Sequence, residues 1–228
     1  MSTPKKPITL NEWQEMFNHV YGQTNSTLSP VQMWLHLMEE AGEVARDMRK
    51  EDYASLANDL PDLFAWLCSF SNQTGIKIEQ AVWEKYPKIC PYCLRSNNCV
   101  CISEGFSSYD SRRLNRYRKN NSKPDSLESW EEMFKNIFGN VNRILSRASI
   151  GFHLMEEIGE VASLLRRNDF DSYSVEIADV FAWLVAIPMK MPELGTLSEM
   201  AWSVYPGICK RCKMHVCGCE GNLTGPRL

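Results

Sequence analysis

The chain has 228 residues, of which 44% are hydrophobic and 23% are charged, proportions typical of a globular protein. Its net charge of −3 argues against a protein that binds nucleic acid through overall positive charge. No apolar run is long enough to span a bilayer, and the start of the sequence lacks the pattern of a secretory signal. We therefore expect a cytoplasmic protein with no membrane partner.

The sequence contains two copies of one segment. LHLMEEAGEV (Leu35–Val44) returns as FHLMEEIGEV (Phe152–Val161), 117 residues later. DLPDLFAWL (Asp59–Leu67) returns as EIADVFAWL (Glu176–Leu184) at the same interval. Self-similarity at a fixed interval predicts two copies of one domain.

The copies are joined by a segment of different composition, which carries six basic and three acidic residues and almost no apolar periodicity. Its arginines and tyrosines could engage the phosphates of a nucleic acid, but we interpret it as a basic flexible linker. The predicted boundaries are residues 1–101 for the first domain, 102–126 for the linker, 127–219 for the second domain and 220–228 for a tail.

Apolar residues recur with helical spacing through each copy. In the first copy they predict helices over residues 10–21, 34–48, 63–70 and about 77–85. No segment alternates in the way that a half-buried strand does. The sequence therefore predicts an all-α protein with two tandem four-helix bundles, each followed by a small cysteine-rich element and packed as a pseudo-dimer.

Pairs of acidic residues occupy the apolar helices. Glu40 and Glu43 are three residues apart, as are Asp59 and Asp62 on the next helix, so each pair projects from one face. The second copy repeats this set as Glu157, Glu160, Glu176 and Asp179. Clustered carboxylates repel one another unless a cation neutralises them, and their oxygens suit Mg²⁺ or Mn²⁺.

The alternative is that these are solvated acids on the polar faces of amphipathic helices. The recurrence argues against it, because 15 residues separate Glu43 from Asp59 and also Glu160 from Glu176. A solvated face does not need to preserve that spacing, although a duplication alone would keep part of it.

The pattern E-E-x-x-E, a spacer and E-x-x-D resembles the signature of the MazG-like, all-α nucleoside triphosphate pyrophosphohydrolases, and the second copy matches it from Glu156 to Asp179. The resemblance implies a helical bundle, usually dimeric, that uses Mg²⁺ to split a nucleoside triphosphate into a monophosphate and pyrophosphate. It also implies that Glu157, Glu160, Glu176 and Asp179 are the metal ligands.

The first copy departs from the family pattern. Asp59 replaces a glutamate, and Pro61 lies inside the same helix, where it removes a backbone donor. In WEKYP, however, the first copy carries Lys85, a position where family members often have a lysine that could contact phosphate. A hypothesis is that the first copy supplies cationic groups and the second the better metal site; decay of the first copy is the alternative.

We name Glu39 and Glu156 as candidates for deprotonating the attacking water.

Cysteines form a second kind of cluster at the end of each copy, as C-x2-C-x5-C-x-C and C-x2-C-x4-C-x-C. Four close thiols favour a structural Zn²⁺ over disulfides or an iron–sulfur cluster. The sequence therefore predicts two zinc sites. Their ligands are Cys90, Cys93, Cys99 and Cys101 in the first copy and Cys209, Cys212, Cys217 and Cys219 in the second.

Two functions are consistent with these patterns. The first is a Mg²⁺-dependent pyrophosphohydrolase that cleaves an NTP or dNTP by attack of water on the α-phosphorus, acting as an intramolecular pseudo-dimer or a further homo-oligomer. The alternative is a non-catalytic, zinc-containing helical module that binds a nucleotide, a nucleic acid or a protein.

Overall fold

The computed structural model describes residues 4–105, 111–169 and 172–219, so the predicted tail at 220–228 lies outside the described residues. All regular secondary structure within these ranges is helical, which confirms the predicted all-α class. None of the described helices is long and apolar enough to cross a membrane.

The helices follow the repeat. The first copy forms α1 (Leu10–Asn25), α2 (Pro30–Lys50), α3 (Tyr53–Thr74) and α4 (Ile78–Lys85). The second copy forms α7 (Leu127–Ile144), α8 (Arg147–Arg167), α9 (Tyr173–Lys190) and α10 (Leu197–Val204), with the 3-10 helix η1 (Pro192–Leu194) before α10. Two short helices stand between the copies, α5 (Cys101–Glu104) and α6 (Ser111–Asn120).

Local sequence sets where the acid-bearing helices begin and end. Ser29 caps the start of α2 by accepting a hydrogen bond from the Gln32 backbone, and Pro30 fits the first helical position. The helix ends where Glu51 adopts a left-handed conformation with φ of 57°. α8 repeats this arrangement between Ser146 and the left-handed Asn168.

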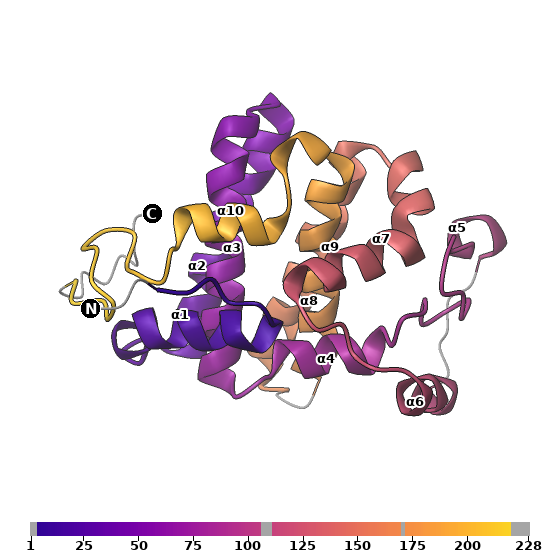
Figure 1. Ribbon diagram of the computed structural model, residues 1–228, viewed down its shortest axis with the longest axis horizontal. Helices are drawn as coiled ribbons and strands as arrows, with labels where there is room; N and C mark the ends of the chain where they lie inside the picture. The colour runs from indigo at the N-terminus through magenta and orange to yellow at the C-terminus, as the bar shows by residue number, and fades with distance from the viewer. Residues whose placement is uncertain (1–3, 106–110, 170–171, 220–228) are drawn as a thin grey trace. The chain divides into compact units, whose positions relative to one another are not determined.

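The compact units of the structure do not coincide with the copies in the sequence. Unit 1 takes its described residues from Met1–Ile78 and Leu194–Leu228, and unit 2 takes them from Glu79–Glu193. Within unit 1, α10 of the second copy packs on α3 of the first, as Figure 1 shows with α10 in yellow beside the purple α3. Each unit therefore combines three long helices of one copy with the fourth helix and cysteines of the other.

Matching tryptophan contacts hold the exchanged helices. In unit 1, Trp202 of α10 meets Trp13 of α1 edge to face, with ring centroids 6.3 Å apart. In unit 2, Trp83 of α4 meets Trp130 of α7 at the same separation. Such aromatic pairs bury large apolar areas, so the fourth helix is part of the core of the unit that receives it.

The central helix of each unit is buried on almost every side. In α3 the run from Leu60 to Ser71 is buried throughout, and the helix continues through Pro61. In α9 the run Ile177–Phe181 is likewise buried. Asp62 and Asp179 lie within these runs, so each unit has a carboxylate in its interior.

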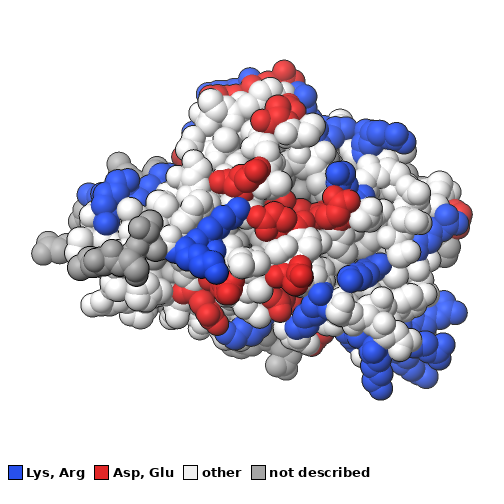
Figure 2. Space-filling model, in the orientation of Figure 1, with Lys and Arg blue, Asp and Glu red and all other residues white. Residues whose placement is uncertain are grey.

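The segment expected to be a flexible linker contains an ordered helix in its described part. α6 docks within unit 2 through Leu114, which is 1% exposed, and Arg118 donates a hydrogen bond to the carbonyl of Glu84. A single leucine among polar residues gives too weak a periodicity to reveal this helix in the sequence. The exposed side of α6 carries Arg112, Arg113, Arg116 and Lys119, and Figure 2 shows blue side chains gathered where Figure 1 places α6.

The docking of α6 predicts a stability effect. Leu114→Ala should lower the free energy of unfolding by about 2 kcal/mol, because it leaves a cavity at a buried position. Lys119→Ala, on the exposed side of the same helix, should change it by less than about 0.5 kcal/mol. Urea titration followed by circular dichroism measures both, and equal effects would contradict the docked position.

Candidate active site and cysteine clusters

Unit 2 brings three of the predicted carboxylates together. Glu157 projects from α8, and Glu176 and Asp179 project from adjacent turns of α9. Oxygens of these three side chains lie within 4.8 Å of one another. Glu160, the fourth predicted ligand, lies one turn after Glu157 with its side chain exposed, outside this close group.

Two side chains of the first copy hold Asp179. Lys85, at the end of α4, donates to Oδ2, and the hydroxyl of Tyr86 donates to Oδ1 at 2.5 Å. Both residues are buried, as is Asp179, which is 7% exposed. Lys85 was predicted to contact phosphate, and in the structure it neutralises a carboxylate at the candidate metal site.

Burial and mutual repulsion disturb the titration of this group. Burial, followed by the charges of Asp179 and Glu160, raises the pKa of Glu157 to about 8. Burial also raises the pKa of Glu176 to about 7, although Lys85 opposes the rise. The group therefore takes up protons readily, or it can take up a cation in their place.

An aromatic pocket opens beside the carboxylates within unit 2. Its volume is about 300 Å³, and Glu157 and Asp179 form part of its wall. Most of the remaining wall is apolar or aromatic, formed by Tyr86, Tyr92, Phe134, Phe138, Val141, Leu145, Ala182, Trp183, Ala186 and Met189. Asn142 and His153 add polar groups, and Cys90, Cys99 and Cys101 complete the wall. The size and lining are typical of a small-molecule site.

Unit 1 repeats the buried aspartate with a different lysine. The Tyr205 hydroxyl donates to Asp62 Oδ1 at 2.5 Å, and Lys210 Nζ donates to Oδ2 at 2.9 Å. Tyr205 corresponds to Tyr86 in the repeat, but Lys210 lies between two cysteines, while Val204 occupies the place of Lys85. The tyrosine could have been found from the repeated W-x-x-Y-P pattern, whereas no sequence signal marked Lys210.

Arg46 forms salt bridges with three further acids of the first copy. Arg46 Nη2 contacts Asp59 at 3.1 Å, Nε contacts Asp47 at 2.7 Å, and Nη1 lies 3.7 Å from Glu43. The second copy has Ser163 at the position of Arg46. Sequence reasoning missed this arginine. Among the described residues, Glu160 and Glu176, the counterparts of Glu43 and Asp59, form no such salt bridge.

Glu40 keeps the character of a ligand position in unit 1. Its side chain is 9% exposed, and its buried Oε2 has no hydrogen-bond partner among the residues that the structure describes. Burial, with the charge of Asp62 next, raises the pKa of Glu40 to about 8. Among the described residues, however, Glu40, Glu43, Asp59 and Asp62 do not form a group as close as that of unit 2.

The two candidates for deprotonating water lie on the surface. Glu39 and Glu156 have side chains 74% and 64% exposed, and their Oε2 atoms lie 3.0 and 3.2 Å from the Nδ1 atoms of His36 and His153. His153 stacks on Trp183 with ring centroids 4.5 Å apart, so the histidine reaches the pocket wall while Glu156 does not.

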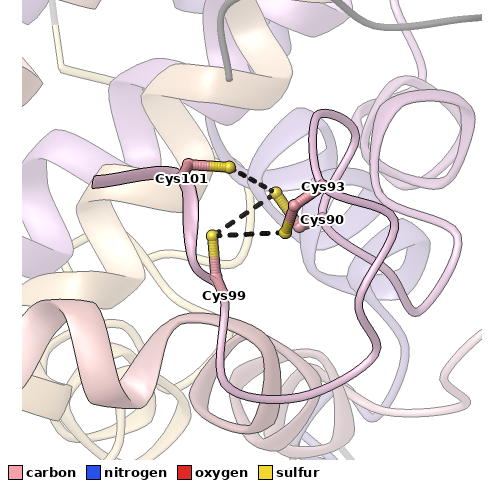
Figure 3. A group of neighbouring side chains, drawn as sticks. All are labelled: Cys90, Cys93, Cys99 and Cys101. Atoms are coloured by element: carbon pink, nitrogen blue, oxygen red, sulfur yellow. Dashed lines mark hydrogen bonds between the residues drawn. The ribbon is translucent and has the colours of Figure 1, made fainter. Parts of the chain in front are cut away.

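The cysteines converge as predicted. Figure 3 shows the four sulfurs of the first cluster pointing toward one another, with Cys90 and Cys99 3.5 Å apart and Cys93 and Cys99 3.7 Å apart. Sulfurs bound at about 2.3 Å around a tetrahedral Zn²⁺ would be about 3.8 Å apart. The sulfurs of the second cluster also lie within 4.8 Å of one another. Both donor sets therefore fit zinc.

The carboxylates fit a different metal. Three carboxylates with raised pKa values meet a single lysine, Lys85, within the described part of the chain, which leaves negative charge to be neutralised. Oxygen ligands favour a hard divalent ion such as Mg²⁺. The structure thus has soft donors in the cysteine clusters and hard donors between α8 and α9.

Residues 28–94 match the family model of the MazG nucleotide pyrophosphohydrolase domain. The matched segment covers α2, α3, α4 and the first two cysteines of the first cluster, Cys90 and Cys93. No curated protein and no solved structure gave a match. The match supports the nucleotide pyrophosphohydrolase family for this segment at a coarse level, and it falls on the copy in which Arg46 binds the acids.

The raised pKa values predict how stability changes with pH. In the folded protein, Glu40 and Glu157 keep their protons up to about pH 8, whereas the ordinary carboxyl pKa is 4.5. The stability of protein without Mg²⁺ should therefore fall as the pH rises through this window, because the unfolded chain releases these protons earlier. Added Mg²⁺ should raise the melting temperature by more at pH 8.5 than at pH 5.5. Each kcal/mol of free energy that Mg²⁺ binding contributes should raise it by about 3 °C.

Thermal melts of protein dialysed free of Mg²⁺ measure this effect. Glu157→Gln should weaken the response, whereas Glu156→Gln, an exposed neighbour, should preserve it. A Mg²⁺ response independent of pH would show that the buried carboxylates do not bind the ion.

Proposed function

We propose that unit 2 is the active centre of a nucleotide pyrophosphohydrolase that cleaves an NTP or dNTP to a monophosphate and pyrophosphate. The observation that carries the proposal is the convergence of Glu157, Glu176 and Asp179, since Glu157 and Asp179 form part of the wall of an aromatic pocket. A triphosphate placed here would have its base against aromatic rings and its phosphates at the carboxylates. The family match of residues 28–94 supports the same chemistry.

Glu157, Glu176 and Asp179, with Glu160 beside them, would hold Mg²⁺ or Mn²⁺. When bound, the metal supplies charge neutralisation of the triphosphate and activation of a water molecule. Lys85 and Tyr86 fix both oxygens of Asp179, so that carboxylate is oriented before substrate arrives. The lysine also reduces the repulsion between the acids and the incoming phosphates.

The base would occupy the apolar side of the pocket. Phe134 and Phe138 stack with ring centroids 6.2 Å apart, and Trp183 with His153 forms a second flat surface. Asn142 is 5% exposed and offers an amide donor and acceptor to a base edge. Glu156 remains a sequence prediction for the proton acceptor, since its carboxylate lies outside the pocket lining.

A different role suits unit 1. Arg46 and Lys210 supply fixed positive charges to its acids, so the carboxylates are partly neutralised without a divalent ion. This observation favours the second candidate function, a non-catalytic binding module, for unit 1. Unit 1 would then bind an anionic ligand or stabilise the chain, while unit 2 performs the hydrolysis.

Pyrophosphate release from a panel of NTPs and dNTPs with Mg²⁺ tests the assignment. Glu157→Gln should lower the rate by about 100-fold or more, the loss typical of removing one electrostatic contact at a reacting centre. Glu40→Gln, its counterpart in the repeat, should retain the rate to within about threefold, because unit 1 does not carry the reaction. Loss of activity only in Glu40→Gln would move the chemistry to unit 1. No release from any nucleotide would favour the binding module for both units.

A further inference from the structure

The first cysteine cluster lies in unit 2, although its sequence belongs to the first copy. Cys90, Cys99 and Cys101 form part of the pocket wall, as does Tyr92 between the first two cysteines. We propose that a zinc ion bound by this cluster holds the wall of the nucleotide pocket, so that zinc in the first cluster, and not in the second, determines nucleotide binding in unit 2. The inference rests on the proposed function for the identity of the ligand.

The cysteine loop is bonded directly to the helix that lines the pocket. The backbone N–H of Asn98 donates to the carbonyl of Asn136 at 3.2 Å, and that of Cys99 donates to Ile137 at 2.9 Å. The amide of Asn140 donates to the Cys99 carbonyl at 2.8 Å. These acceptors and donors lie on α7, which also supplies Phe134, Phe138 and Asn142 to the pocket. Displacement of the loop would therefore disturb the surface on which the base rests.

Turns and left-handed residues shape the loop itself. Between Cys90 and Cys101 the backbone makes two turn bonds, Cys90 N–H to Arg95 and Leu94 N–H to Cys90, at 2.8 and 3.0 Å. Leu94 and Asn98 adopt left-handed conformations, with φ of 59° and 47°, which L-residues rarely adopt and which cost energy. Four converging thiols supply a further constraint once a metal joins them, since binding free energy at such a site becomes folding free energy.

The second cluster provides a matched comparison within the same chain. The backbone N–H of Cys217 donates to the Val20 carbonyl at 2.7 Å, and the Thr24 hydroxyl donates to the Cys217 carbonyl at 3.3 Å. Val20 and Thr24 lie on α1, in unit 1. The cluster of the first copy is therefore bonded to α7 of the second copy, and the cluster of the second copy to α1 of the first. Loss of zinc from one copy should then disturb a helix of the other copy.

Two single variants of the full chain separate the sites. Wild type should contain two zinc ions by inductively coupled plasma mass spectrometry, and Cys93→Ser and Cys212→Ser one each. Calorimetry with Mg²⁺ and α,β-imido analogues of the four common dNTPs should show at least about tenfold weaker binding for Cys93→Ser, because the pocket wall is displaced. Cys212→Ser should bind to within about threefold of wild type. Unchanged affinity in Cys93→Ser, or equal losses in both variants, would overturn the proposal.

Amide hydrogen exchange tests the same coupling without a nucleotide. Cys93→Ser should speed exchange over residues 134–142 of α7, and Cys212→Ser over residues 17–25 of α1. Faster exchange in the helix of the same copy instead would overturn the crossed arrangement. This measurement remains informative even if the wild type neither binds nor hydrolyses a nucleotide. The proposed function would then fail, but the exchange rates would still show whether the zinc loop supports α7.

A variant that keeps all cysteines covers the case in which Cys93→Ser does not fold. Asn140→Ala removes the bond to the Cys99 carbonyl and should retain both zinc ions while speeding exchange over residues 134–142. Gln23→Ala, its counterpart in the repeat, should leave that segment unchanged. Equal exchange in Asn140→Ala and wild type would mean that the loop does not support the pocket.

Discussion

The buried aspartate at the centre of each unit is the constraint on which the rest of the arrangement depends. An ionised carboxylate loses its hydration when it is buried, and an unpaired one is costly enough that it would normally take up a proton. Asp179 is 7% exposed, and its carboxylate accepts hydrogen bonds from a lysine ammonium and a tyrosine hydroxyl. Both donors come from the other copy, so the buried charge at the site is stabilised only because the fourth helix is exchanged.

The two copies solve the same problem with different residues. Tyr86 and Tyr205 are equivalent in the repeat, and each donates to the buried aspartate of its unit. The ammonium arrives from α4 in one unit and from between two cysteines in the other. Both units therefore have a cation beside the aspartate, but the lysine that supplies it stands at a different position in each copy. Arg46 then adds a second fixed cation in unit 1, and the second copy has Ser163 at the equivalent position.

Much of the fold could be predicted because it follows from local patterns. Helical periodicity, the repeat and the cysteine spacing each act over a few residues, and the structure confirms the helices and both clusters. The exchange could not be predicted, since a repeat of 117 residues is the same whether a fourth helix packs on its own copy or on the other. Lys210 and Arg46 were missed for the same reason, because their partners are set by tertiary packing. Leu114 docks α6 with a single apolar side chain, which gives no periodic signal.

Placing both copies in one chain permits an asymmetry that a symmetric dimer forbids. In a homodimer, a substitution such as serine to arginine would appear at both sites at once, because the subunits are identical. Here Arg46 and Ser163 occupy equivalent positions, so Arg46 pairs with Asp59 in the first copy while the second copy has a neutral serine at that place. The exchanged elements nevertheless keep the sites dependent on both copies, since Asp179 needs Lys85 and Asp62 needs Tyr205. Loss of the fourth helix from either copy would therefore leave a buried aspartate in the other without its tyrosine partner.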